Sequence, residues 1–386
     1  MKYMGSKRQM LNNGLGETLD RALADECRFV DLFTGSAAVA RHVAEKYTVP
    51  VVAVDIQAFC IVLAESILLR DAAVDLTLSI ENWISRAEGR LRLSPIYSRA
   101  MSIQGDLTVE RISEVAILAR SLCEESGEDF CKAYGGWYYS PHQALLINAL
   151  RHELPSPRDE AAVALAALVS SASRCAAAPG HTAQPFKADT RAGVYVLEAW
   201  TRDLLADLRK AGSELGGSFA RQKGAAMVED AKVFAKCLNE KDLVFVDPPY
   251  SAVHYSRFYH VLEAVARGRV GPVTGSGRYP ALVERPSSQF SIKTKARAAI
   301  TGLLNQISKA NARAIITFPL ETASNGLSGN LIREIAREKF HIEQEKVSSR
   351  FSTLGGDAVT RTARKESVEL ILSLAPRRQV NTVMKL

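Results

Sequence analysis

Short apolar runs alternate with a helical pattern near the start of the chain. Residues 29–33 (FVDLF) and 51–54 (VVAV) have the composition of buried strands, and residues 37–46 between them have that of a helix. A strand, a helix and a strand in this order form a parallel pair, with the helix as the crossover. The pattern therefore predicts an α/β fold built on a parallel sheet.

The remaining strand-like runs come much later and are separated from the first two by helices. These runs are residues 225–228, 243–246, 314–318 and 368–374. The intervening helical segments include residues 112–125, 142–153, 158–174 and 194–210. A crossover between two strands needs only one helix, so these helices are too many to be a crossover alone. We therefore expect a mainly helical domain at 75–222, inserted into an α/β domain formed by 1–74 and 223–386.

Two segments show neither the pattern of a helix nor that of a strand. Residues 177–187 (AAPGHTAQPFK) and residues 268–289, which are rich in Gly, Pro, Ser and Arg, are expected to be irregular. Loops of this length inside compact domains are usually functional or mobile.

Composition excludes several classes of protein. The chain has 386 residues, 47% of them hydrophobic and 24% charged, which is typical of a globular protein. Its longest apolar run, residues 161–169, is far shorter than the roughly 20 residues that span a membrane. With no signal peptide pattern either, we expect a cytoplasmic protein without a membrane partner. The six cysteines and the histidines lack metal-ligand spacing, so no metal site is expected.

The strongest candidate for chemistry is the run Asp247-Pro248-Pro249-Tyr250, directly after the apolar residues 243–246. Open parallel sheets bind ligands at the carboxyl ends of their strands, which is where this run is expected to lie. A Pro-Pro pair there also makes a rigid turn for purely structural reasons.

The residue types of this run suit the activation of an amino group. The exocyclic amine of adenine is a poor nucleophile because its lone pair is delocalised into the ring. The Asp247 carboxylate and the Pro248 carbonyl would accept hydrogen bonds from it, orient the lone pair and stabilise the developing positive charge. Tyr250 would stack on a base swung out of the duplex.

The DPPY run resembles the catalytic motif of amino-group DNA methyltransferases that use S-adenosyl-L-methionine. Residues 31–37 (DLFTGSA) resemble the cofactor loop of the same enzymes, an acidic residue followed by Phe-x-Gly-x-Gly, with Ala37 in place of the second glycine. The resemblance implies that Asp31, Phe33 and Gly35 bind the cofactor.

Two further acidic residues fit a nucleoside site. Asp55 lies twenty residues after Gly35 at the end of the second predicted strand, where an acid accepts hydrogen bonds from ribose hydroxyls. A simple helix cap is the other interpretation of Asp55. Asp230 follows a later strand, where many methyltransferases hold the adenine amino group of the cofactor.

The first seven residues and the order of the motifs resemble the Dam-like adenine methyltransferases. Residues 2–7 (KYMGSK) are similar to the Lys-aromatic-x-Gly-Gly-Lys segment of that family. By the resemblance Tyr3 contacts the cofactor by packing, and Lys7 does so by its charge. The recognition domain of that family lies between the cofactor and catalytic motifs, which assigns target recognition to residues 75–222. Residues 364–371 are similar to its last core strands.

The resemblance implies a Rossmann-like methyltransferase that modifies the amino group of adenine in double-stranded DNA after base flipping. Such an enzyme acts alone or beside a nuclease partner in restriction-modification or phage defence. Four alternatives stay open: methylation of the cytosine amino group, an RNA substrate, a nicotinamide-dependent oxidoreductase, and a non-catalytic DNA-binding subunit. The oxidoreductase would share the early strand-helix-strand unit, but the loop lacks G-x-G-x-x-G.

Candidate DNA contacts follow the DPPY run. Tyr255 and Tyr259 are candidates for the wall of the base pocket, whereas Phe258 and Val261 are expected in the core of a helix. The whole chain has a net charge of +7, yet residues 267–313 alone hold nine basic residues against one acidic residue, a net +8. The basic side chains expected to contact phosphates are Arg278, Arg285, Lys293 and Lys295.

Overall fold

The computed structural model describes residues 7–23, 27–352 and 364–377, with the backbone alone at 349–352 and 364–367. The described residues divide into two compact units. The sheet unit comprises the residues up to Ile56, Gly224–His254 and the chain from Ser287 onward. The helical unit comprises Gln57–Lys223 and Tyr255–Pro286.

A seven-stranded sheet forms the centre of the sheet unit. Its order is β3 (Ala225–Val228), β2 (Val51–Asp55), β1 (Arg28–Asp31), β4 (Asp242–Val246), β7 (Arg313–Pro319), β9 (Arg364–Pro376) and β8 (Phe340–Ser352). The first five strands are parallel, whereas β9 is antiparallel to both of its neighbours. The predicted α/β fold is thus confirmed, and five strands are parallel as predicted, whereas the antiparallel pairing of β9 with β7 and β8 was not predicted.

The register brings acidic residues together at one edge of this sheet. Asp31 and Asp55 are the last residues of β1 and β2, and Asp247 directly follows β4. Because β9 runs in the opposite direction, Glu369 pairs with Pro319, the last residue of β7. Four carboxyl side chains from four strands therefore lie along the carboxyl edge.

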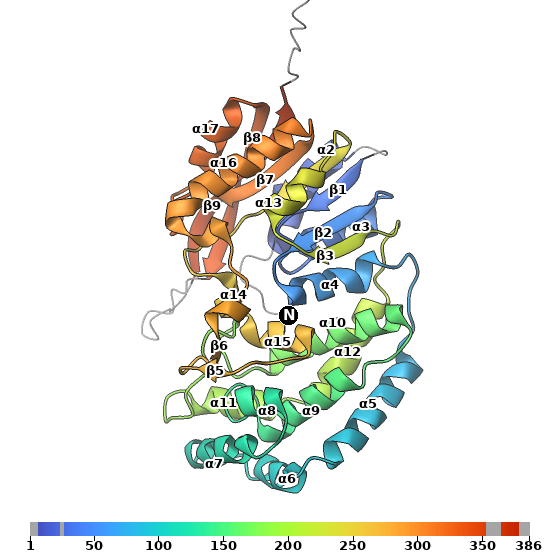
Figure 1. Ribbon diagram of the computed structural model, residues 1–386, viewed down its shortest axis with the longest axis vertical. Coiled ribbons are helices and arrows are strands. Elements are labelled where there is room, and N and C mark those ends of the chain that lie inside the picture. The colour runs from blue at the N-terminus through green and yellow to red at the C-terminus, as the bar shows by residue number, and fades with distance from the viewer. Residues whose placement is uncertain (1–6, 24–26, 353–363, 378–386) are drawn as a thin grey trace, which may run out of the picture. The chain divides into compact units, whose positions relative to one another are not determined.

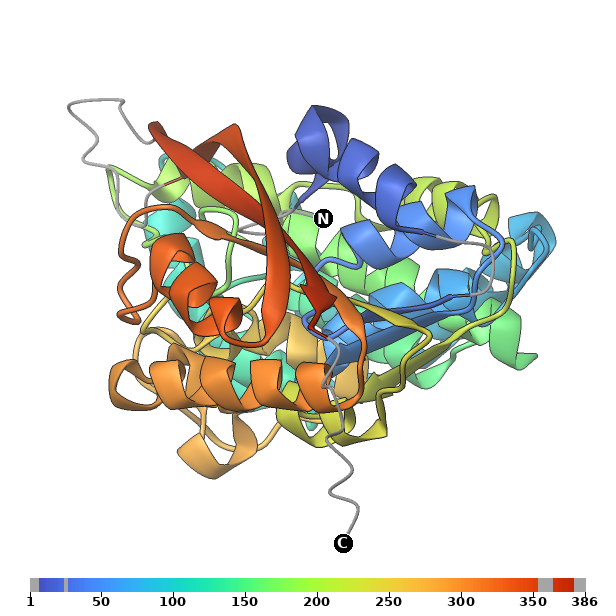
Figure 2. The same ribbon diagram turned by 90° about the horizontal axis from the view of Figure 1, so that it is seen from above.

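Helices cover the apolar faces of the strands. The strand residues Val244 and Ile316 share one core cluster with Ile300 and Leu304 of α16 (Lys293–Lys309). Figure 2 shows α16 beside β8 and β9, which form a long twisted antiparallel pair. The other helical segments of this unit are α1 (Arg8–Met10), η1 (Leu11–Leu15), α2 (Gly16–Ala22), α3 (Ala38–Lys46), α13 (Ala231–Phe234), η2 (Ala235–Cys237), η4 (Gln289–Ser291) and α17 (Gly329–Arg337).

The helical unit is built around α10 (Arg158–Cys175), which packs on α4, α9, α12 and α15 (Figure 1). Its Ala-rich sequence permits close approach of these neighbours, and residues 166–172 are all buried. The remaining helices are α4 (Ala58–Leu68), α5 (Thr77–Arg92), α6 (Tyr97–Gly105), α7 (Ile112–Glu124), α8 (Asp129–Tyr134), α9 (Pro141–His152), α11 (Gly193–Trp200), α12 (Leu204–Gly216), α14 (Tyr255–Phe258) and α15 (His260–Arg267).

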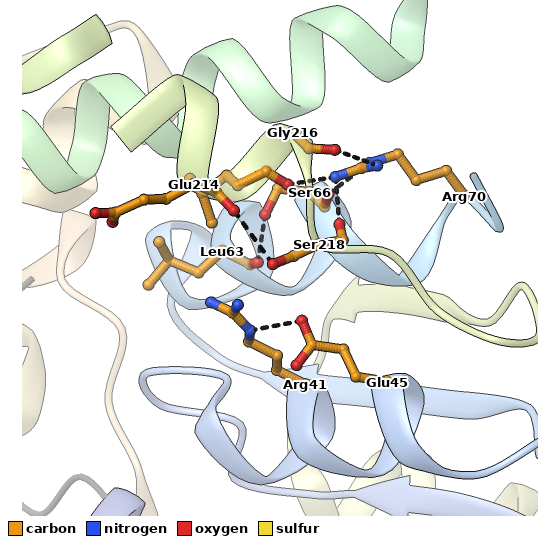
Figure 3. Close-up of polar contacts among 9 residues, drawn as sticks. Arg41, Glu45, Leu63, Ser66, Arg70, Glu214, Gly216 and Ser218 are labelled. Atoms are coloured by element: carbon orange, nitrogen blue, oxygen red, sulfur yellow. Dashed lines mark hydrogen bonds and ion pairs between the residues drawn. The ribbon is translucent and has the colours of Figure 1, made fainter. Parts of the chain in front are cut away.

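The buried side chain of Arg70 links the C-terminal ends of helices α4 and α12. The Arg70 guanidinium donates to the carbonyls of Ser66, Ala72 and Gly216 at 2.9, 2.7 and 3.1 Å, and to those of Leu215 and Ser218 (Figure 3). These carbonyls lie at the ends of α4 and α12, where helices leave their last acceptors without intrahelical donors. Arg70 therefore caps both helices at once.

At the level of elements, one sequence prediction is wrong and one strand was not predicted. The single helix expected over 194–210 is two helices, α11 and α12, separated at residues 201–203. Strand β8 was not predicted, because its sequence is mostly polar. The expected irregular segments are confirmed at 177–187, and largely at 268–289, which holds only the short strands β5 (Val273–Thr274) and β6 (Tyr279–Pro280) and the turn η3 (Leu282–Glu284).

The predicted domain limits at 74/75 and 222/223 stay a prediction, as does the recognition role of residues 75–222. In the structure, α4 and residues 255–286 pack with the helical unit. No helix in the described ranges is both long and apolar enough to span a membrane. All six cysteines are free thiols.

Candidate active site

The centre of the candidate site is the carboxylate of Asp247, at the end of the fully buried strand β4. Its side chain is 14% exposed. Its Oδ1 atom lies 3.0 Å from Nζ of Lys7 and accepts a hydrogen bond from the Thr317 hydroxyl at 2.8 Å. Both contacts go to the same oxygen, so the carboxylate is held at one side and its Oδ2 edge is left to other partners.

Lys7 joins Asp247 to a second carboxylate. Its side chain is only 5% exposed, and Nζ lies 3.2 Å from Oε2 of Glu369, which is 4% exposed. The ammonium also lies 5.6 Å from the centre of the Tyr250 ring, within cation–π range. Lys7 was predicted to contact the cofactor; its observed partners are the catalytic-motif residues and Glu369. The cofactor contact stays a prediction.

Lys7 and Asp247 shift each other's pKa, and the charge of Glu369 acts on both. Burial lowers the pKa of Lys7, but the carboxylates of Asp247 and Glu369 outweigh burial and raise it, so Lys7 is an ammonium ion. Burial raises the pKa of Asp247, Lys7 opposes that rise, and the charge of Glu369 adds to it. The Lys7 ammonium therefore pairs with two buried carboxyl groups, those of Asp247 and Glu369.

The turn after Asp247 is held from a distant part of the chain. The side chain of Asn325, itself fully buried, donates to the carbonyls of Pro249 at 2.7 Å and Phe290 at 3.0 Å. The Tyr250 ring packs edge-on against Phe318, with ring centres 6.2 Å apart. These contacts fix the backbone and the ring of the DPPY run. Asn325, Thr317 and Glu369 belong to no sequence motif that would mark them as site residues.

The predicted cofactor loop forms a tight turn between β1 and α3. Gly35 and Ala37 both have left-handed backbone angles, with φ of +51° and +58°. The Gly35 amide donates to Oδ2 of Asp55 at 2.9 Å, which fastens the loop to the end of β2. Ala37 thus adopts the conformation for which glycine is normally selected.

Asp31 is the most buried acid of the edge. Its Oδ1 atom accepts a hydrogen bond from the Phe33 amide at 3.3 Å. Burial raises the pKa of Asp31 to about 8, and the neighbouring charges of Asp247 and Asp55 add to the rise. The Phe33 ring packs edge-on against Phe290 at 5.0 Å.

The remaining cofactor candidates have mixed outcomes. Asp230 caps α13, since its Oδ1 accepts a hydrogen bond from the Lys232 amide at 2.8 Å. Tyr3 lies outside the described residues.

Tyr255 and Tyr259 belong to the helical unit and differ in exposure. Tyr255 is half-buried and packs edge-on against Phe258. Tyr259 is 1% exposed and packs against Phe59 with ring centres 5.4 Å apart, so it lies in the core in this structure. The expectation that Phe258 and Val261 are core residues is confirmed.

The predicted basic segment is divided between the two units. In the helical unit the Arg278 guanidinium donates to the carbonyls of Lys132 and Ala133 at the end of α8, at 2.9 and 2.8 Å. Arg285 is half-buried, 5.7 Å from the centre of the Tyr279 ring. In the sheet unit Lys293 and Lys295 are exposed in the first turn of α16. Arg278 thus has a structural partner, whereas the two lysines point to solvent.

No group of three or more His, Cys, Asp or Glu side chains in the described part of the chain is arranged to hold a metal ion.

Residues 3–95 match the model of the D12 class N6 adenine-specific DNA methyltransferase family. This range contains Lys7, the cofactor loop and Asp55, and ends before the DPPY run. No curated protein matches the chain. The match confirms the predicted resemblance and the predicted enzyme class, an adenine-specific DNA methyltransferase. The seven-stranded sheet is compatible with a methyltransferase fold.

Proposed function

We propose that this adenine-specific DNA methyltransferase transfers the methyl group of S-adenosyl-L-methionine to the exocyclic amino group of adenine in double-stranded DNA, after flipping the base out of the helix. The observation that carries the proposal is the Asp247 carboxylate, held through Oδ1 by Lys7 and Thr317 at the end of β4. A carboxylate fixed in this way is ready to accept a hydrogen bond from an incoming amine without reorganising.

In the proposed reaction the chain orients the amine rather than forming a bond to it. The Oδ2 edge of Asp247 and the Pro248 carbonyl accept the two N–H groups, which directs the nitrogen lone pair away from the ring plane. The buried carboxylate stabilises the positive charge that develops on nitrogen, and the methylated nitrogen would then lose one of its N–H protons by way of this carboxylate to give the neutral methylamino group. Tyr250, braced by Phe318, stacks on the flipped base. Asn325 keeps the Pro249 backbone in place during the reaction.

The cofactor supplies an electrophilic methyl group on a sulfonium ion. The donor set at the carboxyl edge fits a nucleoside with a cationic centre, because Asp55 and Asp31 end β2 and β1 beside the Gly35 turn. Asp55 would accept hydrogen bonds from the ribose hydroxyls, and Phe33 would pack on the cofactor. By the resemblance, Asp230, Tyr3 and Lys7 complete the site.

The loss of the Asp247 carboxylate tests the proposed chemistry. Asp247→Asn keeps the shape but weakens the acceptor, so kcat is expected to fall at least about 100-fold. Asp71→Asn, at an exposed carboxylate outside residues 75–222, serves as the control. Digestion of methylated DNA to nucleosides and mass spectrometry identifies the product base. Near-wild-type activity of Asp247→Asn would contradict the assignment, and N4-methylcytosine as the product would favour the cytosine alternative.

The proposed DNA contacts are Arg285, Lys293 and Lys295, together with Tyr255. Each lysine or arginine that neutralises one phosphate steepens the salt dependence of binding. Arg278 is a weaker candidate because its guanidinium holds the end of α8. A nuclease or defence partner stays a prediction of the resemblance.

Alanine at Lys293 and Lys295 is expected to weaken DNA binding equally for all sequences. The slope of log K against log salt should fall by about one for each lost contact. Binding titrations between 50 and 200 mM salt measure that slope, with Lys241→Ala, at an exposed lysine directly before β4, as the control. An unchanged slope would mean that these lysines are merely solvated.

A further inference from the structure

Glu369 occupies an unusual place for a buried acid. It lies on β9, the antiparallel strand, whose reversed direction brings it opposite Pro319 at the carboxyl edge of the parallel strands. Its Oε2 atom lies 3.2 Å from Nζ of Lys7, the same ammonium that lies 3.0 Å from Asp247. Burying a second carboxylate beside Asp247 is costly, so its presence calls for a physical explanation.

We propose that Glu369 and Thr317 are positioning residues that adjust Asp247 in opposite directions, Thr317 by donating a hydrogen bond to Oδ1 and Glu369 by competing for Lys7. The proposal rests on the function proposed above, in which the ionised Asp247 carboxylate accepts the adenine amine. Neither residue contacts the reacting atoms in this scheme.

The competition preserves the acceptor strength of Asp247. An ammonium paired with Asp247 alone would neutralise most of its charge in this buried setting, and a neutralised carboxylate stabilises a developing cation poorly. With Glu369 also pairing with Lys7, the ammonium is shared between two carboxyl groups and neutralises less of the charge on Asp247. The negative charge that remains is then available to the substrate nitrogen.

The hydroxyl of Thr317 fixes which oxygen meets the substrate. Thr317 is fully buried on β7, and its hydroxyl and the Lys7 ammonium both approach Oδ1 of Asp247. The rotation of the carboxylate is thereby restricted, and Oδ2 remains as the edge that faces an amine. Among the described residues, the charged and polar groups that act on Asp247 are Lys7 from the N-terminal segment, Asp31 from β1, Thr317 from β7 and Glu369 from β9.

The two roles predict pH shifts of opposite sign. Activity requires ionised Asp247, so kcat falls as the pH drops through its apparent pKa. Glu369→Gln removes a neighbouring negative charge, which lowers that pKa, so the acid limb should move to lower pH. Thr317→Val removes a donor to the carboxylate, which raises that pKa, so the acid limb should move to higher pH. We expect each shift to be about half to one pH unit.

The kinetic constants separate positioning from a general loss of structure. In Glu369→Gln, kcat at neutral pH should fall about tenfold while the KM for S-adenosylmethionine changes less than about twofold, because only the acceptor weakens. Thr317→Ser keeps the hydroxyl and should restore the wild-type acid limb. Glu343→Gln, at an exposed glutamate on β8, is the matched charge control.

The outcomes distinguish this inference from the function on which it rests. Wild-type protein that yields no N6-methyladenine overturns the proposed function. Wild-type protein that methylates adenine, with both variants showing the wild-type acid limb or shifts of the same sign, overturns the roles of Glu369 and Thr317 alone. Circular dichroism verifies folding, and if Glu369→Gln does not fold, the Thr317→Val and Thr317→Ser pair decides the inference.

Discussion

Ala37 illustrates what single residues contribute at the sheet edge. Its φ of +58° is a left-handed conformation that costs an alanine about 1 kcal/mol relative to glycine. The turn is nevertheless kept, because Gly35 is fastened to Asp55 and the Ala37 amide donates to the Thr34 carbonyl at 2.8 Å. The residue that departs from the family pattern thus keeps the glycine-like backbone of that pattern.

Glycine is expected to act differently at position 37 and three residues later. Ala37→Gly relieves the strain but loosens the unfolded chain, so the free energy of unfolding should change by less than about 0.5 kcal/mol. Ala40→Gly, in the buried interior of α3, should cost about 1 to 1.5 kcal/mol. Urea denaturation of both variants measures the difference. Equal losses at the two positions would contradict the role of the left-handed turn.

Residues missed by sequence reasoning share one property, which is their distance along the chain from Asp247. Thr317 lies 70 residues after it and Glu369 more than a hundred. Each sits within or beside a segment that was predicted as a strand, but strand patterns do not reveal which side chain reaches the site. Asn325 lies in a loop after β7 and has no pattern at all.

At the level of elements, the break between α11 and α12 shows how local and distant contacts combine. Asp203 caps α12, accepting hydrogen bonds from the amides of Leu205 and Ala206 at 2.9 Å each. The buried side chain of Gln143, from α9, donates to the carbonyls of Ala199 and Arg202 at 3.0 Å. Side chains therefore satisfy backbone groups on both sides of the break.

Removing the cap is expected to destabilise α12. Asp203→Ala leaves two amides without their acceptor and should lower the free energy of unfolding by about 1 kcal/mol. Asp203→Asn keeps a side-chain oxygen and should stay within a few tenths of a kcal/mol of wild type. Chemical denaturation followed by circular dichroism measures both. Stability of Asp203→Ala equal to that of Asp203→Asn would mean that Asp203 is not a cap.

Strand β8 was not predicted because it is an edge strand with a mostly polar sequence. It pairs along its whole length with β9 and forms the end of the sheet order, where polar and charged side chains are common because they discourage pairing with other chains. An edge strand of this kind has no long apolar run to detect.

For the molecule as a whole, each of the two compact units is built from segments that are separated along the chain. Every described residue proposed for catalysis or cofactor binding lies in the sheet unit. The helical unit contains α4 to α12, α14 and α15. Arg70 stabilises the helical unit by joining the ends of α4 and α12. Glu263 on α15 caps the other end of α4, since it accepts hydrogen bonds from the Ala58 and Phe59 amides at the start of that helix.

Replacing Arg70 should therefore weaken the helical unit strongly. Arg70→Met keeps much of the apolar stem but leaves several buried carbonyls without donors, so the free energy of unfolding should fall by about 2 to 4 kcal/mol. Arg92→Met removes an exposed arginine of α5 and should cost less than about 0.5 kcal/mol. Thermal and urea unfolding measure both losses. Losses of similar size would show that the carbonyl contacts of Arg70 contribute little.

The α/β class, the parallel strands β1, β2, β4 and β7, and the edge positions of Asp31, Asp55 and Asp247 could all be predicted from the order of the residues along the chain. This was possible because buried strands require continuous apolar runs, and the residues that follow such runs emerge at one edge. The side chains that surround Asp247 could be identified only from the folded chain. The charge and orientation of that carboxylate depend on Lys7, Thr317 and Glu369, which meet only when strands distant in sequence pair in register.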